Sequence, residues 1–382
     1  MKKQSVFLLI STVLLSAALP GKSLLAPAGP SWQRGAAARI QLAILLDTSG
    51  SMDGLIDQAK SRLWKIVNEL ATARKNGKAP RLQVALYEYG QSSLPAAQGY
   101  LRCVLPLSED LDRVSEELFK LKTNGGDEYC GRVIAAAAGD LAWSAGSSDL
   151  KLIFIAGNEP FTQGETDYRR ACREAIGRGI VVNTIFCGSY QEGLQTAWKA
   201  GADLADGQYV AIDADNAPPP VSAPQDKELA RLGRELNRTY IAYGKDGGMG
   251  KMRQNEQDMN AAAVSPEIAV QRAAAKAAPQ YNNSAWDLVD AYKAGTVRLE
   301  ELREDELPAE MKGMSAGERL GYVDAMRMQR ETLQKKIAAL HAARERFVRD
   351  QMKKPAGAGT LDEAILRALR RQAAAKNFAF VE

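Results

Sequence analysis

The stretch that most constrains the fold runs from Ile40 to Ser51, an apolar segment that ends in a turn of small polar residues. The apolar part is too short for a globular helix and is bounded by Gly and Ser, so it predicts a strand buried on both faces. Asp47, Ser49 and Ser51 occupy alternate positions of the turn, and Gly50 lets the backbone bend so that their side chains face a common point. One carboxylate and two hydroxyls are hard oxygen donors, so we expect a divalent cation here, Mg²⁺ first.

Asp47-Thr48-Ser49-Gly50-Ser51 after a buried strand resembles the Asp-x-Ser-x-Ser signature of the von Willebrand factor A domain, whose metal-ion-dependent adhesion site uses those three side chains. The resemblance covers roughly residues 39–215 and implies a Rossmann-like α/β fold with a doubly wound, mostly parallel sheet. In that family the cation keeps an open coordination position, which an acidic side chain of a partner protein fills. The resemblance therefore implies Mg²⁺ or Mn²⁺ as cofactor and a protein ligand as partner.

The other two metal loops depart from the family's pattern. The second loop of the family presents a Thr after a Gly pair, and here Asp127 takes that place. The third loop normally carries an Asp at the end of the fourth strand, where this chain has Gly157. We expect Asp127 to restore the carboxylate that Gly157 lacks, with Asn158 and Glu159 as candidates to assist through water. The predicted metal ligands are thus Asp47, Ser49, Ser51 and Asp127. The alternative is a site without its metal, whose side chains hydrogen-bond the turn and the next helix terminus.

The pattern of the first half of the chain supports this fold class. Apolar runs and alternation predict strands at residues 40–47, 81–89, 99–107, 152–156, 180–187 and 208–212, and helical periodicity predicts helices at 53–75, 111–121, 167–176 and 194–201. Strands that alternate with helices indicate a mostly parallel sheet with helices on both faces. Ligands of such sheets bind outside the carboxyl ends of the strands, which is where Asp47 lies.

The first 21 residues have the layout of a secretory signal peptide. Lys2 and Lys3 precede an apolar run over residues 6–19, which small and turn-forming residues follow. This predicts export to the periplasm or the medium, with residues 22–38 as a flexible lead-in and no membrane span after cleavage. An uncleaved anchor or a buried helix is the alternative.

A Pro-rich linker at residues 216–225 separates the predicted A domain, residues 39–215, from a helical C-terminal region, residues 226–382. The main element of that region is a long helix over residues 315–353 with apolar residues on a 3-4 spacing, interrupted by Arg330 and Arg344. Such a seam favours coiled-coil-like pairing with another helix of the same region or of a second chain.

The last residues, 378–381, form either a docking strand or a frayed end. Gly247 to Lys251 lacks the spacing of a phosphate loop and predicts a mobile turn.

Composition and motifs exclude several classes of function. The net charge is only +4 with interspersed signs, so no nucleic-acid partner is indicated. His341 is the only histidine and lies on the long helix as a solvated residue, so neither a Ser-His-Asp mechanism nor a histidine-bound zinc is expected. The four cysteines lack a Cys-x-x-Cys pair and leave disulfides and free thiols equally open. They are Cys103, Cys130, Cys172 and Cys187.

The sequence thus predicts an exported, non-enzymatic binding module that engages a protein partner through a modified metal-ion-dependent adhesion site. The alternative is an envelope scaffold that assembles through its helical region, with a vestigial metal site. Self-association through the long helix is compatible with both hypotheses.

Overall fold

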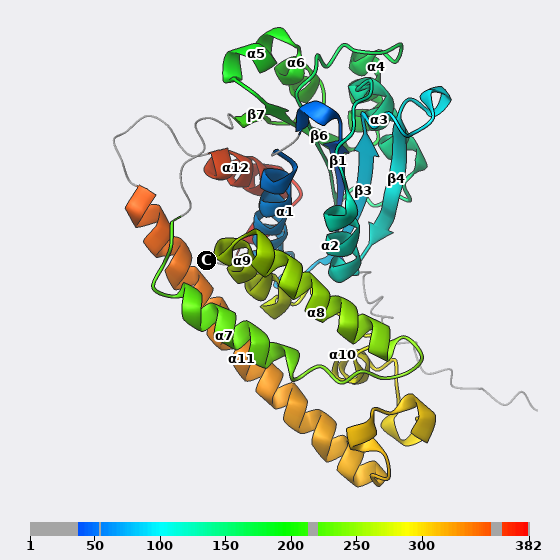
Figure 1. Ribbon diagram of the computed structural model, residues 1–382, viewed down its shortest axis with the longest axis vertical. Helices are drawn as coiled ribbons and strands as arrows, with labels where there is room; N and C mark the ends of the chain where they lie inside the picture. Colours follow the sequence, from blue (N-terminus) through cyan, green and yellow to red (C-terminus); the bar gives the residue numbers. More distant parts are fainter. Residues whose placement is uncertain (1–36, 53–54, 213–220, 353–360, 381–382) are drawn as a thin grey trace, which may run out of the picture. The chain divides into compact units, whose positions relative to one another are not determined.

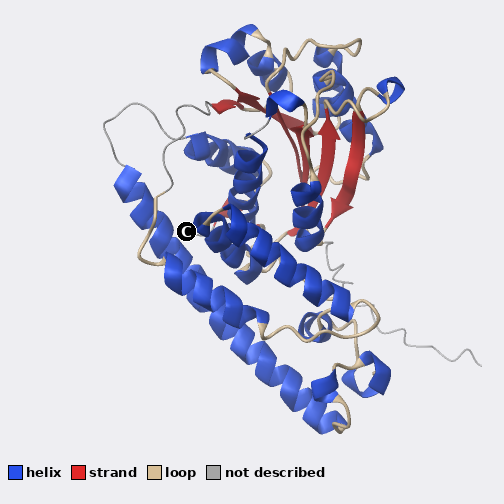
Figure 2. Ribbon diagram, in the orientation of Figure 1, coloured by secondary structure: helices blue, strands red, loops and turns tan. Residues whose placement is uncertain are grey.

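A six-stranded sheet forms the centre of the fold, in the strand order β4-β3-β1-β5-β6-β7. The computed structural model describes residues 37–52, 55–212, 221–352 and 361–380. The strands are β1 (Arg39–Asp47), β3 (Arg81–Tyr89), β4 (Leu101–Ser108), β5 (Leu150–Gly157), β6 (Ile180–Cys187) and β7 (Tyr209–Ile212). All neighbours pair in parallel except β3 and β4, which pair antiparallel. This is the strand order of a doubly wound α/β fold. Figure 2 shows the strands of the sheet in red with helices on both sides of it.

The first strand is buried on both faces, as its apolar run predicts. It pairs with β3 on one side and β5 on the other, so it has no free edge. Leu42 and Ile44 pack into one hydrophobic core, whereas Ala43 and Leu45 pack into a second core on the opposite face. Asp47 ends the strand and is fully buried.

Helices of the first half of the chain cover both faces. One core includes side chains of α1 (Leu55–Thr72) and α2 (Leu111–Lys120). The other includes α3 (Cys130–Asp140), α4 (Tyr168–Gly177) and α6 (Trp198–Asp203), with α5 (Tyr190–Gln195) leading into α6. The predicted helix over 194–201 is in fact broken at Ala197, whose φ of 69° is left-handed. The sequence reasoning did not predict α3.

The second half of the chain is helical, as predicted, apart from one short strand. It contains α7 (Asp226–Asn237), α8 (Gly247–Val264), α9 (Pro266–Ala277), α10 (Leu288–Ala294), α11 (Ala316–Met352), α12 (Leu361–Ala374) and the two-residue strand β8 (Ala379–Phe380). We refer to residues 226–380 as the helical region. It shares the core of the α1 and α2 face, because residues of α7, α9, α11 and α12 belong to the same hydrophobic cluster (Figure 1).

The long helix α11 packs within its own chain, against α7, α9 and α10. The two arginines that interrupt its apolar seam are buried ion-pair partners. Arg330 bonds Asp287 at 2.6 Å and lies 3.9 Å from the ring centre of Tyr240, and Arg344 bonds Asp226 at 2.6 Å. Of the two alternatives for the last residues, a docking strand or a frayed end, the structure shows the strand: β8 pairs with β2 (Ala73–Arg74) at the end of α1.

Two local predictions were wrong. Gly247 to Lys251 is the start of helix α8 and not a mobile turn. The Trp286 ring packs directly on this first turn at Gly250, where a Cβ would lie 2.3 Å from the ring, so only glycine allows this packing. His341 is partly buried and lies 3.3 Å from Gln271 Oε1 of α9.

All four cysteines are free thiols. Among the described residues, no helix combines the length and the apolar composition that a bilayer crossing requires. The predicted signal peptide at 1–21, most of the lead-in and the prolines at 218–220 lie outside the described residues.

Candidate functional site

The first loop of the candidate site brings three predicted ligands together at the carboxyl end of β1. The Ser49 N–H donates to Asp47 Oδ1 at 2.8 Å, and the hydroxyls of Ser49 and Ser51 lie 2.9 Å apart. Ser51 is exposed, and its hydroxyl donates to Asn158 Oδ1 at 3.0 Å. The site therefore reaches from a buried carboxylate to solvent through a short chain of hydroxyl and amide oxygens.

The second loop, residues 121–129, supplies a carboxylate, but from Glu128. Glu128 is 4% exposed and lies against Asp47. Asp127 is exposed, and its carboxylate accepts a hydrogen bond from the Tyr129 hydroxyl at 3.0 Å. The loop is neither helix nor strand, and within it the Glu128 side chain is buried while that of its neighbour Asp127 is exposed. The predicted Asp127 is not among the groups that the structure gathers around Asp47.

Close backbone contacts hold the second loop against the first. The Asn124 N–H donates to the Thr48 carbonyl at 2.9 Å. A Cβ on Gly126 would lie 2.6 Å from the Gly90 carbonyl oxygen, and one on Gly90 would lie 2.7 Å from Asp47 Oδ1 and 2.8 Å from Glu128 Cγ. Gly90 also has a φ of 76°, so glycine is needed there both for conformation and for space.

The two carboxylates are buried without enough hydrogen-bond partners. Asp47 Oδ2 and Glu128 Oε2 have no partner among the described residues. Burial, and next the neighbouring Asp47 charge, raise the pKa of Glu128 to about 9. Burial likewise raises the pKa of Asp47, although the N–H groups of Ser49 and Asn158 oppose the shift. Two buried carboxylates in contact must share a proton or hold a cation between them, because two uncompensated negative charges are too costly there.

The third loop shows why Gly157 replaces an acidic residue. A Cβ on Gly157 would lie 2.5 Å from the Tyr89 hydroxyl oxygen and 3.1 Å from Asp47 Oδ2. The Tyr89 hydroxyl donates to the Ala156 carbonyl at 2.9 Å and so fills this space. A third-loop carboxylate has no room beside Tyr89. The site keeps a second carboxylate because Glu128 enters from the second loop.

The aromatic residues around the site differ in exposure. Tyr89 and Phe161 are fully buried and belong to the core. Tyr129 is half-buried, with its ring centre 5.9 Å from that of Tyr100, and Tyr190 is 52% exposed. Of these aromatic side chains, Tyr129 and Tyr190 can therefore contact a partner, whereas Tyr89 and Phe161 cannot.

The donor set is made only of oxygen atoms. Within the part of the chain that the structure describes, no three His, Cys, Asp or Glu side chains form a group able to hold a metal. A cation would thus rely on the two carboxylates together with hydroxyl and amide oxygens. This set suits Mg²⁺ or Mn²⁺, which prefer oxygen, better than Zn²⁺, which prefers nitrogen and sulfur. The unpaired carboxylate oxygens fit such an ion.

The comparisons with known proteins concern the fold. The chain matches no family model and no curated protein. Among solved structures, it is similar to the conserved hypothetical protein BatB from Bacteroides thetaiotaomicron, with 16% identity and a TM-score of 0.35 over 46% of this chain and 90% of that one. It is also similar to the SpRpn10 VWA domain, with 15% identity and a TM-score of 0.36 over 47% of this chain and 90% of that one.

A third similar structure is proximal thread matrix protein 1 from the mussel byssus with a zinc-occupied MIDAS motif. Here the identity is 14% and the TM-score 0.36, over 47% of this chain and 43% of that one. The strand order of the sheet and the place of Asp47 to Ser51 at the carboxyl end of its first strand are what the predicted resemblance implied. The first half of this chain has the von Willebrand factor A fold.

Proposed function

We propose that this protein is an exported binding module that engages a protein partner through a divalent cation. The observation that carries the proposal is the pair of buried carboxylates, Asp47 and Glu128, whose unpaired oxygens lie behind the exposed Ser51 hydroxyl. Mg²⁺ or Mn²⁺ would be held by Asp47, Ser49, Ser51 and Glu128. When bound, the ion supplies a concentrated positive charge that can accept one further oxygen ligand, such as an acidic side chain of the partner.

Export rests on the predicted signal peptide at residues 1–21. A non-enzymatic role rests on the residue types present, since the only histidine of the chain lies on α11 against Gln271 of α9. Around Asp47 the chain offers carboxylates and hydroxyls with no imidazole base.

Calorimetric titration of the metal-free protein with MnCl₂ and MgCl₂ tests the proposal. The structure offers a matched pair of variants, Glu128→Gln and Asp127→Asn, which remove one negative charge each from neighbouring residues. We expect Glu128→Gln to weaken Mn²⁺ binding roughly 10- to 100-fold, in the range for groups that support a metal site. We expect Asp127→Asn to change binding less than about twofold, because an exposed charge is screened by water. Equal losses would restore Asp127 as a ligand.

The scaffold alternative makes the opposite prediction. In that case the wild-type protein binds no cation and assembles through its helical region. The seam of α11 gives this alternative little support, because it already packs against α7, α9 and α10 of the same chain. Absence of Mn²⁺ and Mg²⁺ binding by the wild type, together with self-association in analytical ultracentrifugation, would favour the scaffold.

A further inference from the structure

The two helices joined to the carboxylate-bearing loops lie on the same face of the sheet. Helix α1 follows the Asp47–Ser51 loop, and α2 leads into the loop that carries Glu128. Both helices pack into the core on that face, through residues such as Trp64 of α1 and Leu118 of α2. A displacement of α1 or α2 should therefore change the position of the loop next to it in the chain.

Helix α1 is held by the helical region along one side. The Asn68 side-chain amide donates to the Gln271 carbonyl at 2.9 Å and to its side-chain oxygen at 2.6 Å. Lys65 pairs with Glu267 of the same helix α9 at 3.1 Å, and Glu69 pairs with Arg370 of α12. Helices α9 and α12 of the helical region thus both bond to α1.

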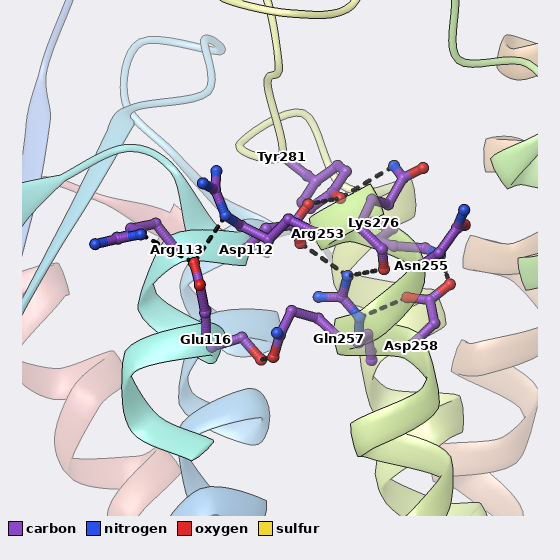
Figure 3. A network of polar contacts seen from close by, with 12 residues as sticks. Asp112, Arg113, Glu116, Arg253, Asn255, Gln257, Asp258, Lys276 and Tyr281 are labelled. Atoms are coloured by element: carbon purple, nitrogen blue, oxygen red, sulfur yellow. Dashed lines mark hydrogen bonds and ion pairs between the residues drawn. The ribbon is translucent and has the colours of Figure 1, made fainter. Parts of the chain in front are cut away.

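Helix α2 is held by a buried polar network (Figure 3). Asp112 is 1% exposed and accepts hydrogen bonds from Arg272 at 2.8 Å and from the Tyr281 hydroxyl at 2.5 Å. One turn further along, the Ser115 hydroxyl donates to Gln257 of α8 at 2.9 Å.

The network continues on both sides of these contacts. Glu116 pairs with Arg253 of α8 at 2.8 Å. On the other side Arg272 also pairs with Asp258 at 2.6 Å. Because Asp112 is buried, any shift of α2 away from Arg272 would leave the Asp112 carboxylate without its counter-ion, and the contacts therefore hold α2 in one position.

We propose that the helical region is a positioning element for the cation site, with Gln257, Gln271 and Arg272 as its positioning residues. By fixing α1 against α9 and α12, and α2 against α8 and α9, it sets the distance between the Asp47 loop and the Glu128 loop. This inference rests on the proposed function for the cation but makes a separate statement about the metal-free loops. By linkage, any cation bound between the loops also strengthens the contacts of α1 and α2 with the helical region.

Two variants loosen the contacts without leaving a buried charge. Ser115→Ala/Gln257→Leu replaces both members of a buried hydrogen bond by apolar groups, which costs little stability in itself. Asn68→Ala removes the donor of the α1 contact. The control is Arg319→Gln, which removes the hydrogen bonds from the buried Arg319 side chain to the Leu302 and Met314 carbonyls inside the helical region, at residues that take no part in the α1 and α2 contacts described above.

The experiment measures three quantities on the full chain: amide exchange of residues 121–129 in chelator, Mn²⁺ affinity, and melting temperature. We expect both contact variants to speed exchange in 121–129 and to weaken Mn²⁺ binding roughly three- to tenfold, the usual size of coupling through packed elements. We expect the control Arg319→Gln to lower the melting temperature without speeding exchange in 121–129 or weakening Mn²⁺ binding.

A purely structural role for the helical region gives a different result. Contact variants that lower the melting temperature while exchange in 121–129 and Mn²⁺ affinity stay at wild-type values would overturn the inference. If the wild type binds no Mn²⁺, the proposed function fails, but exchange in chelator still decides this inference. Faster exchange in the contact variants supports positioning, and unchanged exchange refutes it.

Discussion

The two faces of the sheet are covered in different ways. On the face of α3, α4 and α6, the hydrophobic core ranges from alanines to large aromatic residues such as Trp198, and its helices are close in sequence to the strands they cover. On the face of α1 and α2, a second layer of helices from the far end of the chain lies over the first. That second contact includes fully buried charged and amide side chains such as Arg272, Gln257 and Asp112.

This difference shows what each face contributes. The apolar face gains stability from burial that needs no exact partner, because hydrophobic burial is non-directional. The polar face gains little net energy from its ion pairs, since desolvation offsets much of the attraction, but it fixes one geometry. The polar face is also the one whose helices carry the cation loops. We therefore expect substitutions on the two faces to differ in how much they lower the free energy of unfolding.

The largest effect is expected from removing the helical region altogether. A chain that ends at residue 215 exposes Asp112 and the apolar surface of α1 and α2 that α8, α9 and α12 cover. We expect it to show no cooperative thermal unfolding by circular dichroism, because more than a third of the described buried residues of the core on this face come from the helical region. A sharp transition close to that of the full chain would show that the A-type fold is independent, and that the two faces differ less than we infer.

A single substitution on each face gives a finer comparison. Arg272→Met leaves Asp112 buried without its counter-ion, which should lower the free energy of unfolding by about 3–5 kcal/mol. Ile134→Val in α3 removes one buried methylene and should cost about 0.5–1.5 kcal/mol. Urea unfolding of both variants measures the difference. Similar losses would mean that the ion network has water or other partners that replace Arg272.

The apolar pattern was sufficient to predict the sheet. β3 and β6 begin and end at the predicted residues, and β1 and β7 differ by one residue, because each strand shows an apolar run or an alternation of apolar and polar residues. The Ser265 cap and Pro266 at the start of α9 were also predictable, since their side chains have a local role at a helix start. In each case the signal lies within a few neighbouring residues.

Helix α8 could not be predicted in this way. Its buried side includes Gly250, Gln254 and Gln257, so the residues that face the core are not hydrophobic and give no helical periodicity. Glu128 was missed for a related reason, because a loop without regular structure has no pattern that separates an inward residue from its outward neighbour Asp127. A signal did exist for Glu128, since two consecutive carboxylates offered two candidates for the same role.

An added methyl group at the site should have a moderate effect. Gly157→Ala places a Cβ 2.5 Å from the Tyr89 hydroxyl oxygen, which should cost about 1–3 kcal/mol of unfolding free energy. Tyr89→Phe alone loses the bond to the Ala156 carbonyl and should cost about 1 kcal/mol. Because the same hydroxyl causes both effects, the double variant should lose less than the sum of the two. Additive losses measured by urea unfolding would show that Tyr89 does not fill the third-loop space.

The smallest effect concerns the charge of the site in the absence of cation. The pKa of Glu128 is about 9 in the folded protein, against an ordinary value of 4.5 for a glutamate carboxyl, so the folded form keeps a proton that the unfolded chain releases between these values. This contribution to stability is complete below pH 4.5 and is lost as the pH rises toward 9. In chelator, Glu128→Gln should therefore be more stable than wild type at about pH 8, and the advantage should vanish near pH 4.5. The same Glu128→Gln variant should bind Mn²⁺ more weakly, so that one substitution raises metal-free stability and lowers cation affinity. A melting temperature difference that does not change with pH would mean that the two carboxylates are not in contact.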